Sequence, residues 1–386
     1  MTHTTSSQPA ALLGALVLGA LGVGAAYAFV PAERFWANWI LWLLFLVTLS
    51  LGALFIVALE HLVSARWSVP VRRVPERIAT LLLVAVPTAL VGLMALPVLY
   101  PGTRPEALQN KLLAGKATWL GVPFFSARVV IGLALGLLGL WILVKGSLRQ
   151  DETQDPAQNR RARTFAPVFM AIFGFTITQT GWDWVKGLTP EWFSDIFGVY
   201  VFAGAFLAAL AATVLTVLSL RDEGRLEGVK CDHLYNLGGF LFGFTVFWSY
   251  IGFAQYMLMW YANMPEEVYW YRWRVEGGWG AVTLLLALVH FVIPFFALVT
   301  RDAKQDPARL RWVAKLMLAA HVLDLYWMVF PSVPSLRHGP VFSWPELSFL
   351  LCFGSLVLLW VRRAQGVGRD MPVGDAFLKE GLEFRL

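Results

Sequence analysis

The sequence predicts an all-α integral membrane protein with ten transmembrane helices. Hydrophobic residues make up 58% of the 386-residue chain and charged residues only 15%, against about 25% in ordinary soluble domains. Ten apolar runs are long enough to cross a hydrocarbon core of about 30 Å, which takes about 20 helical residues. Charged residues, Pro and Gly fill the breaks between these runs. This composition excludes a soluble fold.

The ten runs follow one another along the whole chain. We expect spans at residues 9–30, 35–62, 77–99, 125–146, 165–184, 197–220, 234–261, 278–300, 311–331 and 343–362. The start of the chain lacks the basic stretch of a cleaved signal peptide, so we interpret the first run as a retained helix. Short tails at 1–8 and 363–386 flank a single transmembrane domain.

Basic residues set the expected orientation. Most of the 31 Lys and Arg residues follow the second, fourth, sixth and eighth spans or lie in the C-terminal tail. By the positive-inside rule, both termini are then cytoplasmic. Many of the eighteen tryptophans lie near span ends, as in the aromatic belts of membrane proteins.

Two segments have a similar sequence pattern. The fifth span ends in "GWDWVKGLTPEW" and the ninth in "LDLYWMVFPSVP", and each places an acid before aromatic residues and then a proline. Four spans separate them, so both run in the same direction, as parallel repeats require. The similarity favours two related four-helix bundles, at 35–184 and 197–331.

Three ionisable residues occur at membrane depth in the eighth and ninth spans. His321 and Asp324 are three residues apart, so they share one face of a helix. His290 lies at a similar depth in the preceding span. Such residues face a protein interior or a water-filled cavity, because a charge in hydrocarbon is costly. We therefore expect the three side chains to lie within reach of one another.

Three interpretations of this group stay open. It could relay protons, since imidazole titrates near neutral pH, or hold a b-type haem between the two histidines. It could also be structural, with buried histidines bonded to backbone carbonyls. The nearby acid favours the relay over the haem. The two cysteines, Cys231 and Cys352, form no cluster, so we expect no Fe–S or zinc site.

Other polar residues extend the candidate path. Glu60 and His61 lie near the cytoplasmic end of the second span. They are either the cytoplasmic entrance of a proton pathway or partners of nearby arginines. The arginines at 72, 73 and 77 are interpreted as positive-inside anchors.

The fifth and seventh spans carry further candidates. Thr176, Gln179 and Asp183 form a polar stripe in the fifth span. Three roles for this stripe stay open: binding a quinone head group, conducting protons, or joining helices by hydrogen bonds. In the aromatic seventh span, Tyr250 and Gln255 are candidates for quinone contact. The same aromatic density suits lipid contact and helix packing.

Several sequence segments together resemble one protein family. They are "HLVSARWSVPVRRVPE", "GWDWVKGLTPEWFSDIFGVYVFAG", "GGFLFGFTVFWSYIGFAQYMLMWYANMPEEVYWYRWR" and "HVLDLYWMVFP". Over about residues 35–360 the chain resembles the NrfD-like membrane subunits of bacterial alternative complex III, in particular the ActF type. The phrase "HFVIPFFALVTRDAK" is shared more widely among NrfD-like proteins.

The resemblance implies a fold and a role. It implies two four-helix bundles between peripheral first and last helices, in the bacterial inner membrane. It implies an accessory subunit of a quinol:cytochrome c oxidoreductase, with no cofactor of its own and with haems and Fe–S clusters on partner subunits. Those partners are a multihaem cytochrome, an Fe–S protein, a second NrfD-like subunit and small membrane subunits. It implies a proton pathway through Glu60, His61, Asp183, His290, His321 and Asp324.

Two rival functions remain open from the sequence. Ten spans with ionisable groups at depth are compatible with a secondary transporter, although no pair of Gly/Pro-interrupted helices occupies matching positions in the two halves. A structural anchor for peripheral redox subunits is the other alternative. Under that reading, replacing His290 or His321 affects assembly or nothing.

Overall fold

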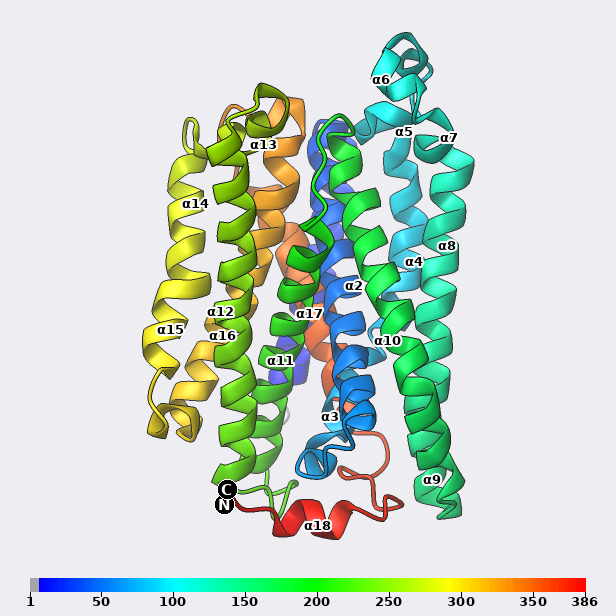
Figure 1. Ribbon diagram of the computed structural model, residues 1–386, viewed down its shortest axis with the longest axis vertical. Helices are drawn as coiled ribbons and strands as arrows, with labels where there is room; N and C mark the ends of the chain where they lie inside the picture. Colours follow the sequence, from blue (N-terminus) through cyan, green and yellow to red (C-terminus); the bar gives the residue numbers. More distant parts are fainter. Residues whose placement is uncertain (1–6) are drawn as a thin grey trace.

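The computed structural model describes residues 7–386, and every regular element in that range is a helix (Figure 1). Nine helical segments among these residues are long and apolar enough to cross a membrane. The prediction of an all-α, multi-pass membrane protein is thus confirmed. The predicted tail at 1–8 lies outside the described residues except for its last two positions, which belong to the first helix.

The nine segments run between the two ends of the molecule. They are α1 (Ser7–Phe29), α2 (Ala32–Leu62), α3 to α5 (Arg73–Ala79, Leu82–Gly92, Leu96–Leu99), α8 and α9 (Val122–Gly139, Gly146–Thr153), α11 (Phe197–Asp222), α12 (Cys231–Ala262), α14 and α15 (Trp279–Ala287, Ile293–Leu298), α16 (Pro307–Val329) and α17 (Trp344–Gln365). Short helices lie in the connections: α6 (Lys111–Ala114), α7 (Ala117–Leu120), α13 (Pro265–Val275) and α18 (Leu378–Glu383). We name the two ends after α13 and α18, which lie at opposite ends (Figure 1).

The fifth predicted span is α10 (Ala157–Trp184), which is not among the nine. Its 28 residues make a helix about 42 Å long, enough to cross a bilayer. Polar residues in its second half lower its hydropathy. Thr176, Gln179 and Asp183 are buried there, because α10 packs its polar stripe against α2, α8 and α11. The tenth span therefore stays a prediction.

Helices α2 and α11 form the centre of the molecule. The apolar stretch of α2 is 94% buried and that of α11 is 78% buried, against 11% for α1. A Cβ atom on Gly52 of α2 would lie 2.3 Å from the carbonyl oxygen of Ala205 in α11, so only glycine allows this close helix contact. Helices α12 to α16 lie on one side of this pair and α4, α8 and α10 on the other (Figure 1).

The arginines expected to anchor the chain at the membrane surface are instead buried. The side chain of Arg72 donates to Glu60 at 3.2 Å and to Asp375 at 2.7 Å. Arg73 is fully buried and pairs with Glu76 at 2.6 Å. Arg73 also pairs with Asp151 of α9, so its partners lie on the helices. Arg72 and Arg77, in contrast, bond Asp375 and Asp370 of the C-terminal tail and hold it to the helices. The role of these arginines as positive-inside anchors stays a prediction.

The tail is attached by both charged and backbone contacts. Arg225 pairs with Asp370 at 2.6 Å, and His233 Nε2 lies 2.9 Å from the carbonyl oxygen of Gly381 in α18. Burial alone would raise the pKa of Asp370, but hydrogen bonds from Arg225 and Arg77 outweigh burial and hold that pKa below its usual value. Helix α18 thus covers the end of the molecule at which it lies (Figure 1).

Candidate functional site

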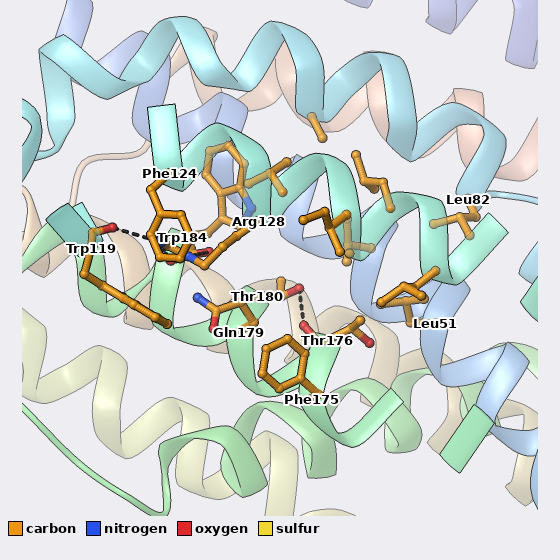
Figure 2. A pocket seen from close by; sticks show the side chains of 18 residues that line it. Leu51, Leu82, Trp119, Phe124, Arg128, Phe175, Thr176, Gln179, Thr180 and Trp184 are labelled. Carbon is orange, nitrogen blue, oxygen red and sulfur yellow. Dashed lines mark hydrogen bonds and ion pairs between the residues drawn. The ribbon is translucent and has the colours of Figure 1, made fainter. Parts of the chain in front are cut away.

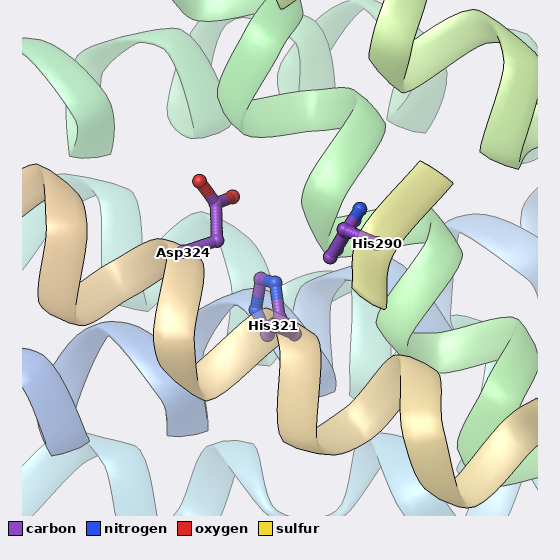
Figure 3. A group of neighbouring side chains, drawn as sticks. All are labelled: His290, His321 and Asp324. Carbon is purple, nitrogen blue, oxygen red and sulfur yellow. The ribbon is translucent and has the colours of Figure 1, made fainter. Parts of the chain in front are cut away.

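The structure brings His290, His321 and Asp324 together, as predicted. Their ligand atoms all lie within 4.8 Å of one another, and each residue is at most 1% exposed. His321 and Asp324 project from one face of α16, and His290 faces them from the segment between α14 and α15 (Figure 3). That segment is a π-helical turn at Leu288–Val292, a common feature beside Pro and at functional sites. We call these three residues the His–Asp cluster.

Two hydroxyl groups from the central helices contact the cluster. Tyr200 of α11 donates its hydroxyl to Asp324 Oδ1 at 2.5 Å. Thr48 of α2 lies 2.9 Å from His321 Nε2, and its single hydroxyl hydrogen is directed to the carbonyl oxygen of Leu44 at 2.7 Å. When the Thr48 hydrogen is on the Leu44 carbonyl, Nε2 of His321 is the donor to Thr48 and Nδ1 is the ring nitrogen that can accept a proton.

Several nitrogens of the cluster have no protein partner. Neither ring nitrogen of His290 makes a hydrogen bond with residues 7–386, nor does Nδ1 of His321. Buried polar atoms of this kind usually bind water or an ion, since leaving them unpaired is costly. Gly204 of α11 contributes to the space, because a Cβ atom there would lie 3.5 Å from His321 Nδ1 and 3.6 Å from Asp324 Oδ2. The cluster therefore has three ring nitrogens that no residue among 7–386 bonds, beside a glycine that leaves space next to two of its side chains.

The same donor set suits a metal ion. Two imidazoles and one carboxylate are ligands that bind zinc. Tetrahedral zinc holds its donor atoms about 3.4 Å apart, so ligand atoms spread over 4.8 Å would have to draw together. The expectation that the chain carries no metal site stays a prediction.

A cavity toward the α13 end is lined by residues that contact the cluster, although no cluster residue lines it. It has a volume of about 370 Å³ and lies among α11, α12, α13, α14 and α16. Tyr200, which bonds Asp324, lines it, and so does Trp248, whose ring centroid lies 3.8 Å from that of His290. Gln255 also lines it, with a buried amide nitrogen that has no partner in the described chain. We call this space the Gln255 cavity.

Tyr250, which was paired with Gln255 in the quinone prediction, lies elsewhere. Its side chain is 65% exposed and does not line the Gln255 cavity. The two positions are five residues apart, so they point away from each other on α12. The structure thus places Gln255, but not Tyr250, in the cavity that Tyr200 and Trp248 also line.

Arg274 gives the Gln255 cavity a cation that sequence reasoning missed. It is fully buried, lines the cavity and donates to the backbone carbonyls of Trp270, Trp327 and Met328. Burial lowers its pKa well below the usual value. Its guanidinium carbon also lies 3.2 Å from the centre of the Trp270 ring. In the sequence, the segment "WYRWR" resembles an interfacial aromatic belt. It therefore gives no sign that Arg274 is buried beside a cavity.

Asp183 and Gln179 line a second cavity, which no residue of the His–Asp cluster lines. This cavity holds about 260 Å³ among α2, α4, α8 and α10. Asp183 accepts two hydrogen bonds from Arg128, at 2.7 and 3.2 Å, and Arg128 also donates to the carbonyl oxygen of Trp119 (Figure 2). Gln179 has a buried amide nitrogen with no partner among the described residues. The contacts of Asp183 are therefore those of an ion-pair partner rather than of a free proton carrier.

Glu60 and His61 lie toward the α18 end. Glu60 accepts from Arg72, one of the partners considered for it, while His61 Nε2 is buried and bonded to nothing in residues 7–386. The free space beside them is only about 10 Å³, room for about one water. Glu60 is about 18 Å along α2 from Thr48. The six predicted pathway residues thus fall into three separate places.

Comparison with known proteins adds no relative. No protein-family model matches the chain, and no curated protein matches it. The functional argument therefore rests on the chain's own residues and geometry.

Proposed function

We propose that this chain is a membrane subunit of a respiratory quinol:electron-acceptor oxidoreductase of the alternative complex III type, in which it supplies a proton pathway. Quinol oxidation releases two electrons and two protons. In this proposal, haems and Fe–S clusters lie on partner subunits. The chain itself is accessory to the redox chemistry and provides groups that move protons.

The observation that supports this function best is the His–Asp cluster beside the Gln255 cavity. Three titratable groups are buried within 4.8 Å of one another. Membrane proteins keep such groups at depth mainly where ions or protons pass. A purely structural cluster would satisfy its ring nitrogens with protein partners, whereas three of these nitrogens have none in the described chain.

The hydrogen bonds suggest how protons move through the cluster. Nδ1 of His321 accepts a proton while Nε2–H stays bonded to Thr48. The proton passes to the Asp324 carboxylate through a water in the space beside Gly204. Tyr200 bonds Asp324 on the other side and lines the Gln255 cavity, so its hydroxyl connects the carboxylate with the α13 end.

The Gln255 cavity also offers a surface for a quinone head group. Its walls are largely aromatic, and the unpartnered amide of Gln255 and the guanidinium of Arg274 provide donors for a quinone oxygen. Its volume of about 370 Å³ lies within the usual range for small-molecule sites. A head group bound here would be close to Tyr200 and the cluster.

The proposed membrane arrangement has ten spans, with α10 as the fifth. The second to fifth and sixth to ninth spans form two four-helix bundles, and α1 and α17 lie outside them. Each bundle has its own cavity among its own helices, in keeping with related units. The α18 end faces the cytoplasm of a bacterial cell, and the membrane is the inner one.

Mass spectrometry of the proteins that co-purify with the tagged chain in mild detergent tests this function. A multihaem cytochrome, a large Fe–S protein and a second ten-helix subunit are the expected partners. Metal analysis of the same sample should find no zinc in proportion to this chain. Purification of the chain alone would contradict the respiratory assignment, and a substrate-transport screen would then test the transporter alternative.

A further inference from the structure

A large basic groove lies at the α18 end, away from the His–Asp cluster. It has a volume of about 620 Å³. It lies between the junction of α8 and α9 on one side and the first half of α10 on the other. Four cations line it: Lys145, Arg149, Arg160 and Arg161. No Asp or Glu is among the described residues that line it.

These four cations have no protein counter-charge. All four are exposed, and none of their side chains makes an ion pair or a hydrogen bond within residues 7–386. Four buried or half-buried arginines of this end differ: those at 72, 73, 77 and 225 each pair with at least one carboxylate. The groove therefore gathers positive charge that the fold leaves unneutralised, which favours an anionic ligand.

Besides the cations and the polar Gln158 and Thr164, the groove has an apolar wall. Trp141 is 60% exposed and Val168 is 54% exposed, and Phe165 and Ile142 complete this wall. The helix that carries Trp141 is a candidate membrane span, so its exposed side contacts acyl chains. The cations follow within the next turns of the chain. In a membrane, we therefore expect the apolar wall to contact acyl chains and the basic part to lie nearer the membrane–water boundary.

The backbone at the junction shapes the groove. Helix α8 ends in a π-helical turn at Leu140–Lys145 before α9 begins at Gly146. A Cβ atom on Gly146 would lie 3.6 Å from Gln158 Oε1 of α10, so the two helices come together at this level. Both residues line the groove, so this contact forms part of its wall.

We propose that this groove binds an anionic phospholipid, with its phosphate among the four cations and an acyl chain along the wall of Trp141, Phe165 and Val168. The shape and charge match both parts of such a molecule: basic pockets at helix ends on the cytoplasmic side bind acidic head groups. Free phosphate would use the cations alone and would leave the apolar wall without a role. This site is independent of the proposed proton pathway.

Native mass spectrometry of the purified full chain measures this binding. Phosphatidylglycerol and phosphatidylcholine with identical acyl chains are titrated separately, and inorganic phosphate is added as a competitor. The groove variant replaces its four cations by Gln. The matched control replaces four exposed basic residues of the same end by Gln: Arg309, Lys315, Arg363 and Arg369.

The protein should bind phosphatidylglycerol at least about tenfold more tightly than phosphatidylcholine. Each cation removed from the groove should weaken phosphatidylglycerol binding roughly fivefold, while the control should retain it. Equal losses in both variants would show general surface charge and overturn the proposal. So would the absence of a preference over phosphatidylcholine, or full competition by millimolar phosphate. If the fourfold variant fails to assemble, the pair Arg160→Gln and Arg161→Gln gives the same test.

Discussion

Replacing Asp183 by Asn tests whether this residue is an ion-pair partner or a proton carrier. The Asp183 and Arg128 side chains are 4% and 7% exposed, respectively, and form two hydrogen bonds. Asp183→Asn keeps the shape but leaves the Arg128 cation buried without a counter-charge. Breaking a buried pair in this way costs about 3–5 kcal/mol. We therefore expect a loss of this size in the free energy of unfolding.

The double variant Arg128→Met/Asp183→Leu separates the two roles. It removes both charges, so it should recover most of the stability lost by Asp183→Asn, because well-packed apolar pairs often replace buried ion pairs without loss. Unfolding by titration with sodium dodecyl sulfate measures both variants against the unmodified chain. The reasoning would be refuted by an Asp183→Asn variant as stable as the original protein, or by a double variant less stable than the single one.

Three further changes have defined outcomes. Gly52→Ala should destabilise the helix core by about 1–3 kcal/mol in the same unfolding assay, because its Cβ would lie 2.3 Å from a backbone oxygen. Gly204→Ala should leave stability nearly unchanged, since its contacts are 3.5 Å and longer, but should slow proton-coupled turnover by displacing water; normal turnover would contradict this. Burial lowers the pKa of Lys186 to about 8 in the folded chain. Between pH 8 and 10.5 the unfolded chain therefore binds a proton that the folded chain does not, so the free energy of unfolding should rise with pH. Lys186→Met should lose this pH dependence.

The sequence predicts the membrane fold and the His–Asp cluster for the same physical reason. Long apolar runs have few places to fold other than a bilayer, and ionisable groups within them must turn toward one another or toward water. His321 and Asp324 share a helix face by spacing alone. The contact with His290 follows from the adjacency of consecutive spans.

The residues from distant spans that contact these groups could not be predicted in this way. Thr48 and Tyr200 reach the cluster only because α2 and α11 pack at the centre, and Thr and Tyr are common in membrane helices. Arg72 is buried against Asp375 of a C-terminal tail that has no hydrophobic run to predict its packing. Arg274 is satisfied by backbone carbonyls, and no sequence pattern marks such acceptors. Long-range packing, not local pattern, decides all four.

The central claim is that the His–Asp cluster carries protons during quinol oxidation. The most direct measurement is the membrane potential generated per quinol oxidised, in liposomes that contain the assembled complex with Asp324→Asn or His321→Asn. Asp302→Asn and His338→Asn, at exposed positions of the same residue types, are the matched controls. We predict a lower potential per quinol in both cluster variants and an unchanged value in both controls. A normal potential and normal turnover in the cluster variants would contradict the account.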